Sequence, residues 1–433
     1  MSNAAHDPLM NLSLREVDPE LDAVFVNEAV RQRDHIELIA SENYTYAAVR
    51  EAQGSILTNK YAEGLPGKRY YAGCEFVDEA ENLARSRALQ LFVGSEHVNV
   101  QPHSGASANI ATFTAAMSPG DSFVAMSLDQ GGHLSHGASV NISGKWFKPT
   151  FYGVRAEDGL VDWDAVQRAV DEAKPKVVIA GASAYPRSLD FEKFAAIAHA
   201  AGAKLMVDMA HISGVVAAGL HPSPFPHADY VTTTTHKTLR GPRGGMIFAR
   251  ADEAAAIDRA VFPGNQGGPL MHVIAAKAVA YKLALQPEFR AYMQRTRDNA
   301  QALAAALAAR GFGVITGGTD NHLILCDVTP LGVTGKEATA ALEAVGVTIN
   351  KNSIPGETRS PMVTSGVRYG TPAATTRGMG LAEMEQIAQW SVEAIAARED
   401  AAKLEQIRRE VVKVAQKFPV PGNDAAELAA RES

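Results

Sequence analysis

Short apolar stretches alternate with amphipathic segments along the first 250 residues. Short apolar stretches are typical of buried strands, and the one that begins at Tyr230 is a β-branched run. They are residues 122–127, 176–180, 204–208, 230–235 and 246–249. Between several of them apolar residues recur every three or four positions, as in 163–173 and 191–201, with Asp162 and Asp190 as candidate N-caps. This alternation predicts an α/β fold with a mostly parallel sheet covered by helices on both faces.

The pattern changes on either side of this region. Residues 1–35 are polar with a short amphipathic piece at 21–30, residues 36–75 are loop-like, and a helix is expected from Asp78 to Gly94. An Ala-rich helical region follows Pro269 toward Arg310, with a break at Gln286–Pro287. Beyond it we expect strands at 322–327 and 347–350, helices at 337–345, 383–397 and 402–417, and a frayed tail at 421–433. The predicted organisation is an arm over 1–35, a large domain over 36–290 and a small C-terminal α/β domain over 291–433.

Two predicted strand ends carry the candidate chemistry. Lys237 lies just beyond the strand 230–235, before a Gly- and Pro-rich turn, and Asp208 ends the strand 204–208. An isolated lysine in this position usually reaches solvent, but burial would favour the neutral amine that condenses with a carbonyl. Pyridoxal phosphate enzymes need such a pair, a lysine for the aldehyde and a carboxylate for the pyridinium nitrogen. Since ligands bind at the carboxyl ends of parallel strands, we expect both side chains at one site.

A third feature is the small-residue turn at 101–109, Gln-Pro-His-Ser-Gly-Ala-Ser-Ala-Asn, which opens an apolar helical segment. Free backbone N–H groups at the start of a helix can bind a phosphate. Each of the three features is weak alone. Together, and in this order, they indicate a pyridoxal phosphate site.

These residues closely resemble serine hydroxymethyltransferase, a pyridoxal phosphate enzyme of the aspartate aminotransferase fold type. The matching motifs are Ile39–Asn43, Asn59–Gly64, Gly67–Tyr71, Gly131–Leu134, Val207–His211, Thr234–Thr238, Phe262–Gly264, Thr364–Arg368 and Gly370–Ala373. The resemblance covers most of the chain. It implies reversible hydroxymethyl transfer from L-serine to tetrahydrofolate, giving glycine and 5,10-methylenetetrahydrofolate, in a large domain that binds the cofactor and includes the N-terminal substrate loops.

The resemblance also implies the cofactor contacts. Lys237 would form the Schiff base and Asp208 would pair with the pyridinium nitrogen. The other matching positions are Ser104, Gly105 and Ala106 at the phosphate, His133 on the ring, Ser183 and His211 near the phenolic oxygen, and Tyr61, Gly268 and Arg243. His236 and Thr234 flank the lysine and match groups that assist imine exchange, although simple strand-end packing would also explain them.

Substrate and folate positions follow from the same resemblance. Arg368 and Ser41 match residues that bind the substrate carboxylate, where a guanidinium can bind in two places. Glu63 and Tyr71 match acid–base groups at the substrate hydroxyl. The folate positions are Leu128, Gly132, Leu134, Asn352, Ser360, Pro361 and Met362. Family counterparts of Tyr61 and Gly268 reach the phosphate of a neighbouring subunit, which implies a homodimer or a tetramer with shared sites.

Composition narrows the function classes further. The chain has 433 residues, 46% hydrophobic and 21% charged, with a net charge of −7. No run of Lys or Arg exceeds a pair, so nothing indicates nucleic-acid binding. Two cysteines without a metal or redox spacing, and no apolar run of membrane-spanning length, favour a cytoplasmic protein. No metal site is expected, because His133 and His136 lack a third ligand.

Three alternatives remain at this point. A regulatory protein could keep the fold without the chemistry, and a threonine-type aldolase would use the same cofactor without folate. The third is a 2-methylserine hydroxymethyltransferase, because Leu65, Ala72, Gln130 and Tyr369 differ from the usual family residues. We expect serine as the donor, with α-methylserine as the alternative.

Overall fold

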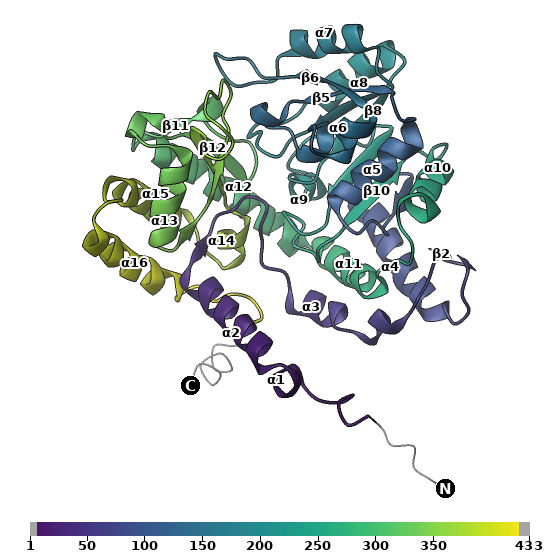
Figure 1. The fold of residues 1–433 in the computed structure, drawn as a ribbon, viewed down its shortest axis with the longest axis horizontal. Coiled ribbons are helices and arrows are strands. Elements are labelled where there is room, and N and C mark those ends of the chain that lie inside the picture. The colour runs from purple at the N-terminus through teal and green to yellow at the C-terminus, as the bar shows by residue number, and fades with distance from the viewer. Residues whose placement is uncertain (1–6, 424–433) are drawn as a thin grey trace.

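A seven-stranded sheet forms the centre of the larger half of the molecule (Figure 1). The computed structural model describes residues 7–423. In spatial order the strands are β4 (His97–Asn99), β10 (Gly245–Ala249), β9 (Tyr230–Thr234), β8 (Lys204–Asp208), β7 (Val177–Gly181), β5 (Ser122–Met126) and β6 (Lys148–Tyr152). Strands β6, β5, β7, β8 and β9 are parallel, and β10 is antiparallel to both of its neighbours. The prediction of an α/β chain with a mostly parallel sheet is confirmed.

All five predicted strands are present, with ends that shift by at most one residue. The two strands that the pattern missed, β4 and β6, lie at the two edges of the sheet. An edge strand has one strand neighbour and tolerates polar residues and proline, as in the Lys148-Pro149 start of β6. Because β4 and β6 contain polar residues, the search for apolar stretches did not identify them.

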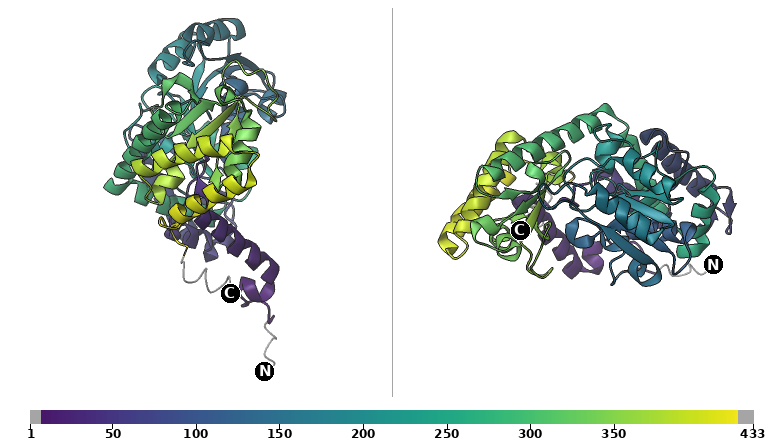
Figure 2. Two further views of the ribbon diagram at one scale, coloured as in Figure 1. Left: turned by 90° about the vertical axis from the view of Figure 1, so that its left-hand side faces the viewer. Right: turned by 90° about the horizontal axis from the view of Figure 1, so that it is seen from above.

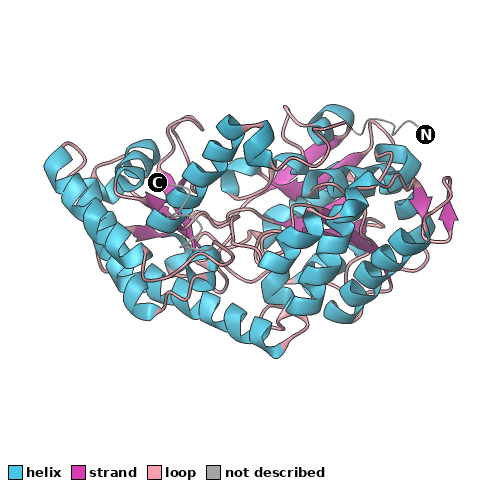
Figure 3. Cartoon of the chain, turned by 90° about the horizontal axis from the view of Figure 1, so that it is seen from below, coloured by secondary structure: helices cyan, strands magenta, loops and turns pink. Residues whose placement is uncertain are grey.

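Helices cover both faces of this sheet (Figure 3). They are α4 (Glu75–Leu91), α5 (Gly105–Ala116), α6 (Ile142–Trp146), α7 (Trp163–Ala173), α8 (Phe191–Ala200), α9 (Ser213–Ala217), α10 (Ala254–Arg259) and α11 (Met271–Ala284). Alternate residues of β5 enter two different hydrophobic clusters, with Phe123 in one and Val124 in the other. The predicted N-caps are confirmed, because Asp162 accepts a hydrogen bond from the backbone of Ala165 and Asp190 from that of Lys193.

The smaller half is built on a four-stranded antiparallel sheet with its own core. Its strands are β11 (Gly313–Val314), β12 (Leu323–Asp327), β15 (Gly366–Gly370) and β14 (Asn350–Asn352), and its helices are α12 (Pro287–Ala308), α13 (Gly335–Ala344), α14 (Pro372–Thr376), α15 (Leu381–Ala396) and α16 (Ala401–Ala415). The predicted break at Gln286–Pro287 separates α11 from α12. The predicted strand at 347–350 is wrong as one unit. Its first part is β13 (Val347–Thr348), which pairs with β1 (Ile36–Glu37), and only Asn350 belongs to β14.

Residues 7–34 project from the rest of the molecule (Figures 1 and 2). Helices α1 (Leu14–Val17) and α2 (Pro19–Asp34) expose large apolar side chains, among them Leu14, Val17, Leu21, Val24 and Phe25. The segment 36–75 was predicted to be loop-like, and this is only partly right. It contains α3 (Ala47–Gln53) and a hairpin of β2 (Gly64–Leu65) and β3 (Lys68–Arg69). Of the predicted frayed tail, residues 424–433 lie outside the described part.

Within residues 7–423, no helix is both long enough and apolar enough to cross a bilayer.

Candidate active site

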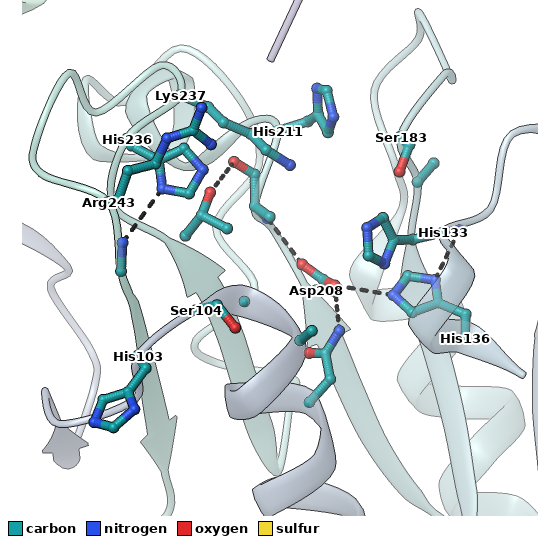
Figure 4. A pocket seen from close by; sticks show the side chains of 17 residues that line it. His103, Ser104, His133, His136, Ser183, Asp208, His211, His236, Lys237 and Arg243 are labelled. Atoms are coloured by element: carbon teal, nitrogen blue, oxygen red, sulfur yellow. Dashed lines mark hydrogen bonds and ion pairs between the residues drawn. The ribbon is translucent and has the colours of Figure 1, made fainter. Parts of the chain in front are cut away.

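Lys237 and Asp208 line one pocket at the carboxyl edge of the large sheet (Figure 4). Asp208 is the last residue of β8, and Lys237 lies three residues beyond the adjacent parallel strand β9. The pocket has a volume of about 280 Å³. Its other walls come from the start of α5 and from the loops that follow β5 and β7. The expected proximity of the two strand ends is therefore present in the fold.

Asp208 is held as an oriented carboxylate. Its Oδ2 lies 2.9 Å from both His136 Nε2 and Asn109 Nδ2, and its Oδ1 accepts a 3.0 Å hydrogen bond from the backbone of Ala210. Burial alone would raise the pKa of Asp208, but the hydrogen bond and charge of His136, helped by His133 and Asn109, hold that pKa well below its usual range. A group facing Asp208 therefore meets a permanent negative charge.

Lys237 is a buried amine in a rigid turn. Its backbone carbonyl accepts a 3.0 Å hydrogen bond from Asn43, and the hydroxyl of Thr238 donates to the carbonyl of His211 at 2.9 Å. Burial lowers the pKa of Lys237 to about 8, against the opposing charge of Asp208. The amine can therefore lose its proton near neutral pH, as a nucleophile requires.

The start of α5 forms a tight wall beside β9 and β10. Ser104 caps the helix, with its Oγ accepting a 3.1 Å hydrogen bond from the backbone of Ser107. A β-carbon at Gly105 would lie only 2.7 Å from Cγ2 of Thr234, and one at Gly245 only 2.4 Å from the carbonyl oxygen of Ser104. These glycines let the helix N-terminus approach the strand ends. Gly105 and Ala106 line the pocket, and their N–H groups have no intrahelical acceptor, since the cap bonds the N–H of Ser107.

Three histidines of the pocket are held neutral. Burial lowers the pKa of His133 to about 4 and that of His236 to about 3, and it lowers the pKa of His211 well below its ordinary value. The Nδ1 of His133 lies 2.7 Å from the hydroxyl of Ser135. Its Nδ1 accepts a 3.1 Å hydrogen bond from the backbone of Ser135. The histidines can therefore stack or hydrogen-bond, while Asp208 supplies the fixed charge.

A larger cavity of about 940 Å³ adjoins this pocket and shares His133, Ser183, Lys237 and Arg243 with it. Arg368 reaches it from β15 of the small sheet, where its guanidinium donates to the carbonyl of Ser183 and to Asn350 Oδ1. Burial lowers the pKa of Arg368 to about 10. Other predicted residues that line this cavity are Ser41, Leu128, Gly132, Leu134, Asn352 and Pro361. Ser360 and Met362 do not line it.

A second group of predicted residues lies apart from both cavities. The rings of Tyr61 and Tyr71 are edge to face at 5.1 Å, and the hydroxyl of Tyr61 donates to Glu63 at 3.2 Å. A β-carbon at Gly268 would lie 3.1 Å from the ring of Tyr61, so this glycine completes the group. We call Tyr61, Glu63, Tyr71 and Gly268 the exposed cluster. Within the described part of one chain, none of its members lines the pocket of Lys237, and Arg243 makes no hydrogen bond to Tyr61.

Sequence reasoning missed three residues with polar side chains that line the pocket. Asn109 and His136 bind Asp208, and His103 lies at the pocket wall beside Ser104. Asn109 could have been found as a polar residue inside an apolar helix, and His136 by its position three residues after His133. Among residues 7–423, no three His, Cys, Asp or Glu side chains gather in a way that could hold a metal ion.

The four positions that depart from the resemblance line neither cavity. Gln130 accepts a 2.8 Å hydrogen bond from the backbone of Val154, and Tyr369 is buried in the small core against Phe312. Leu65 and Ala72 lie in the segment that carries the exposed cluster. Gln130 and Tyr369 therefore have local structural roles away from both cavities.

Known proteins are similar to this chain over nearly its whole length. A family model described as serine hydroxymethyltransferase matches residues 14–391. A serine hydroxymethyltransferase of Phenylobacterium zucineum is 56% identical over 424 residues, covering 97% of this chain and 99% of the relative. One of Acidobacterium capsulatum is 54% identical over 423 residues, with the same coverage of 97% and 99%.

Proposed function

The chain belongs to the serine hydroxymethyltransferase family, and we propose that its two adjoining cavities hold pyridoxal 5′-phosphate and tetrahydrofolate. The enzyme transfers the hydroxymethyl group of L-serine to tetrahydrofolate and produces glycine and 5,10-methylenetetrahydrofolate. The observation that carries this assignment is the pairing of a buried Lys237 with an ionised Asp208 in a pocket that opens onto a larger cavity. We also assign the fold to the aspartate aminotransferase type.

The residues of the smaller pocket fit pyridoxal 5′-phosphate. The close approach of Gly105 to Thr234 brings the first turn of α5 to the pocket wall, where its N–H groups suit a phosphate. Asp208 suits a protonated ring nitrogen, and the neutral His133 can lie on a ring face. When bound, this cofactor withdraws electrons from the bond that breaks at the substrate α-carbon.

The protein's own groups then have distinct tasks. Asp208 keeps a proton on the ring nitrogen, because its carboxylate is fixed by His136 and Asn109. Lys237 presents an amine that can exchange with the substrate amine, and Thr234 and His236 flank it. Arg368 and Ser41 bind the substrate carboxylate, which aligns one bond of the α-carbon for cleavage. Burial of Arg368 strengthens this charge pair.

The larger cavity favours a folate-dependent transferase over a threonine-type aldolase. It has room beside Lys237 for a second large molecule, and Leu128 and Leu134 present apolar side chains there. A flat pteridine ring would pack on them, with Asn352 as a polar partner. An aldolase without folate has no use for this space.

The exposed cluster supports a homodimer or a tetramer with shared sites. Glu63 and Tyr71 are assigned the proton transfers at the substrate hydroxyl, and Tyr61 and Gly268 a role at the phosphate. Since none of them lines the pocket of its own chain, we infer that they complete the pocket of a partner. The apolar side chains exposed on α1 and α2 would be buried by such an assembly.

The remaining assignments belong to the same proposal. We place the large cofactor-binding domain at residues 36–290 and the small domain at 291–433, which the two sheets support, although Ile36 and Leu38 pack in the core of the small half. We also propose a cytoplasmic location, which the two free buried cysteines, Cys74 and Cys326, support.

The test is an assay of the purified protein with L-serine, with and without tetrahydrofolate. We expect rapid formation of glycine and 5,10-methylenetetrahydrofolate only when folate is present. Glycine released from threonine at a comparable rate without folate would favour the aldolase. Binding of the cofactor without turnover of any amino acid would favour a regulatory protein.

A further inference from the structure

Lys277 is a buried lysine that the proposed mechanism leaves without a role. It lies on α11, with 1% of its surface exposed, and its Nζ donates to the carbonyl oxygens of Val100 at 2.6 Å, Pro102 at 3.1 Å and Gly245 at 2.8 Å. Three carbonyl acceptors require three N–H donors, and only the ammonium form has three. The geometry therefore selects a charged Lys277, although burial lowers its pKa to about 7.

This ammonium group lies directly behind the wall of the cofactor pocket. Two of its carbonyl partners adjoin pocket residues, since Pro102 precedes His103 and Gly245 follows Gly244. A β-carbon at Gly244 would lie only 3.0 Å from Nζ of Lys277. The charge also acts inside the pocket. After burial, Lys277 is a further cause of the lowered pKa values of His103 and His236.

The protein does not neutralise this charge by direct contact. The carboxylate that acts on it, Glu81, is itself bound by Arg69 at 2.7 Å and by Gln101 at 2.9 Å. Among residues 7–423, no carboxylate forms an ion pair with Lys277. A buried cation without a counterion is costly, so an anion in the adjoining pocket would be stabilised by it.

We propose that Lys277 is a positioning residue that makes the pocket selective for a phosphorylated cofactor. Its three hydrogen bonds fix the backbone on both sides of the pocket wall, at 100–102 and 245, and its charge attracts the phosphate from behind that wall. The proposal rests on the assignment of pyridoxal 5′-phosphate to this pocket. A purely structural lysine would brace the same carbonyls but would not distinguish a phosphorylated ligand from an unphosphorylated one.

The experiment compares three ligands on cofactor-free protein. Pyridoxal 5′-phosphate and pyridoxal have the same aldehyde and ring, so their dissociation constants differ by what the phosphate contributes, and inorganic phosphate is the competitor. The variants are Lys277→Met, which removes the charge, and Lys277→Arg, which keeps it. Lys282→Met is the matched control, because Lys282 is an exposed lysine on the same helix.

We expect Lys277→Met to weaken binding of pyridoxal 5′-phosphate about tenfold or more relative to pyridoxal. Lys277→Arg should retain the preference, and Lys282→Met should match the parent protein. Competition by inorganic phosphate should weaken in Lys277→Met alone. Equal losses for both pyridoxal ligands would overturn the proposal and leave Lys277 as a structural brace.

If these variants do not fold, the charge role of Lys277 can be tested on the parent protein. With lysine labelled with ¹³C at Cε, inorganic phosphate should raise the pKa of Lys277 measured by nuclear magnetic resonance, and an unchanged pKa would contradict the charge role. The proposed function fails separately, if borohydride reduction of the parent protein does not link pyridoxal 5′-phosphate to Lys237.

Discussion

The pocket around Lys237 and the exposed cluster around Tyr61 differ in how the chain holds them. In the pocket, the Asp208 carboxylate receives three hydrogen bonds, and Lys237 is buried in a turn tied to neighbouring segments. In the cluster, Tyr61 donates a hydrogen bond to the side chain of Glu63, and the two tyrosine rings are about half exposed. Within one chain the pocket brings Lys237 and Asp208 together, whereas the cluster holds acid–base groups that line neither cavity.

This difference separates binding from turnover. Groups that hold a cofactor must be oriented before it arrives, which the buried contacts of one chain provide. Groups that handle protons need only reach the substrate in the assembled enzyme. The comparison therefore predicts that variants of Lys237 or Asp208 lose the cofactor, and that variants of Glu63 or Tyr71 keep it and lose the reaction.

The largest effect is expected for Lys237→Ala. We expect activity to fall by at least about 10³-fold, because the variant lacks the amine that attaches the cofactor and exchanges with the substrate. Borohydride reduction and peptide mapping should label the parent protein at Lys237 and leave the variant unlabelled. Lys204→Ala, at a partly exposed ion pair with Glu253, is the control. A label on another lysine of the parent protein would contradict the assignment.

Glu63→Gln should impair the reaction without affecting cofactor binding. Loss of a general acid–base group typically reduces the rate by about 10²–10⁴-fold. Because Glu63 does not line the pocket of its own chain, the dissociation constant of pyridoxal 5′-phosphate should change by less than about threefold. Glu79→Gln, an exposed carboxylate of α4, should change neither quantity. Normal folate-dependent turnover in Glu63→Gln would remove this residue from the mechanism.

Mixing two inactive variants tests whether the cluster serves a partner chain. In hybrids of Lys237→Ala and Glu63→Gln subunits, one site combines an intact pocket with an intact cluster. Half of the dimers in an equal mixture are hybrids, so activity should recover to about a quarter of the parent value. Each variant refolded alone is the control. A failure to recover activity in proven hybrids, or an active monomer in sedimentation, would show that each chain completes its own site.

Sequence patterns predicted the residues of the Lys237 pocket better than those of the exposed cluster. A buried strand has a repeating apolar signature, so β8 and β9 and the residues at their ends could be located before the fold was known. Tyr61, Glu63 and Tyr71 lie in a polar segment whose pattern resembles an ordinary surface loop, and only the family resemblance singled them out. Asn109 and His136 were missed because their role depends on distances to Asp208 across the fold.

The pH dependence of cofactor attachment probes the burial of Lys237. The neutral amine attacks the aldehyde, so attachment should accelerate as the pH rises through the pKa of about 8 and should then level off. Between pH 7 and pH 9 the neutral fraction increases about tenfold, and the rate constant should follow. Asp208→Asn should move the midpoint to lower pH, because the charge of Asp208 raises the pKa of Lys237. A midpoint near 10, as for an exposed lysine, would contradict the burial.

The smallest effects are expected at the positions that depart from the family resemblance. One methyl group in an apolar pocket changes selectivity by about 1–3 kcal/mol, so a substitution must touch the substrate to change the donor. Gln130 holds the backbone of Val154, and Tyr369 packs in the small core, so neither should distinguish L-serine from α-methyl-L-serine. We expect L-serine to be preferred, and Gln130→Ala to change the ratio of the two kcat/KM values by less than about threefold.

Ala72→Gly is the sharper variant, because Ala72 is next to Tyr71 in the segment inferred to complete the partner's pocket. If Ala72→Gly changed the ratio of the two kcat/KM values by the equivalent of about 1–3 kcal/mol, the segment of the exposed cluster would determine which donor is preferred. A preference of the parent protein for α-methyl-L-serine would make that choice the distinguishing property of this chain, while leaving the roles of Lys237 and Asp208 intact.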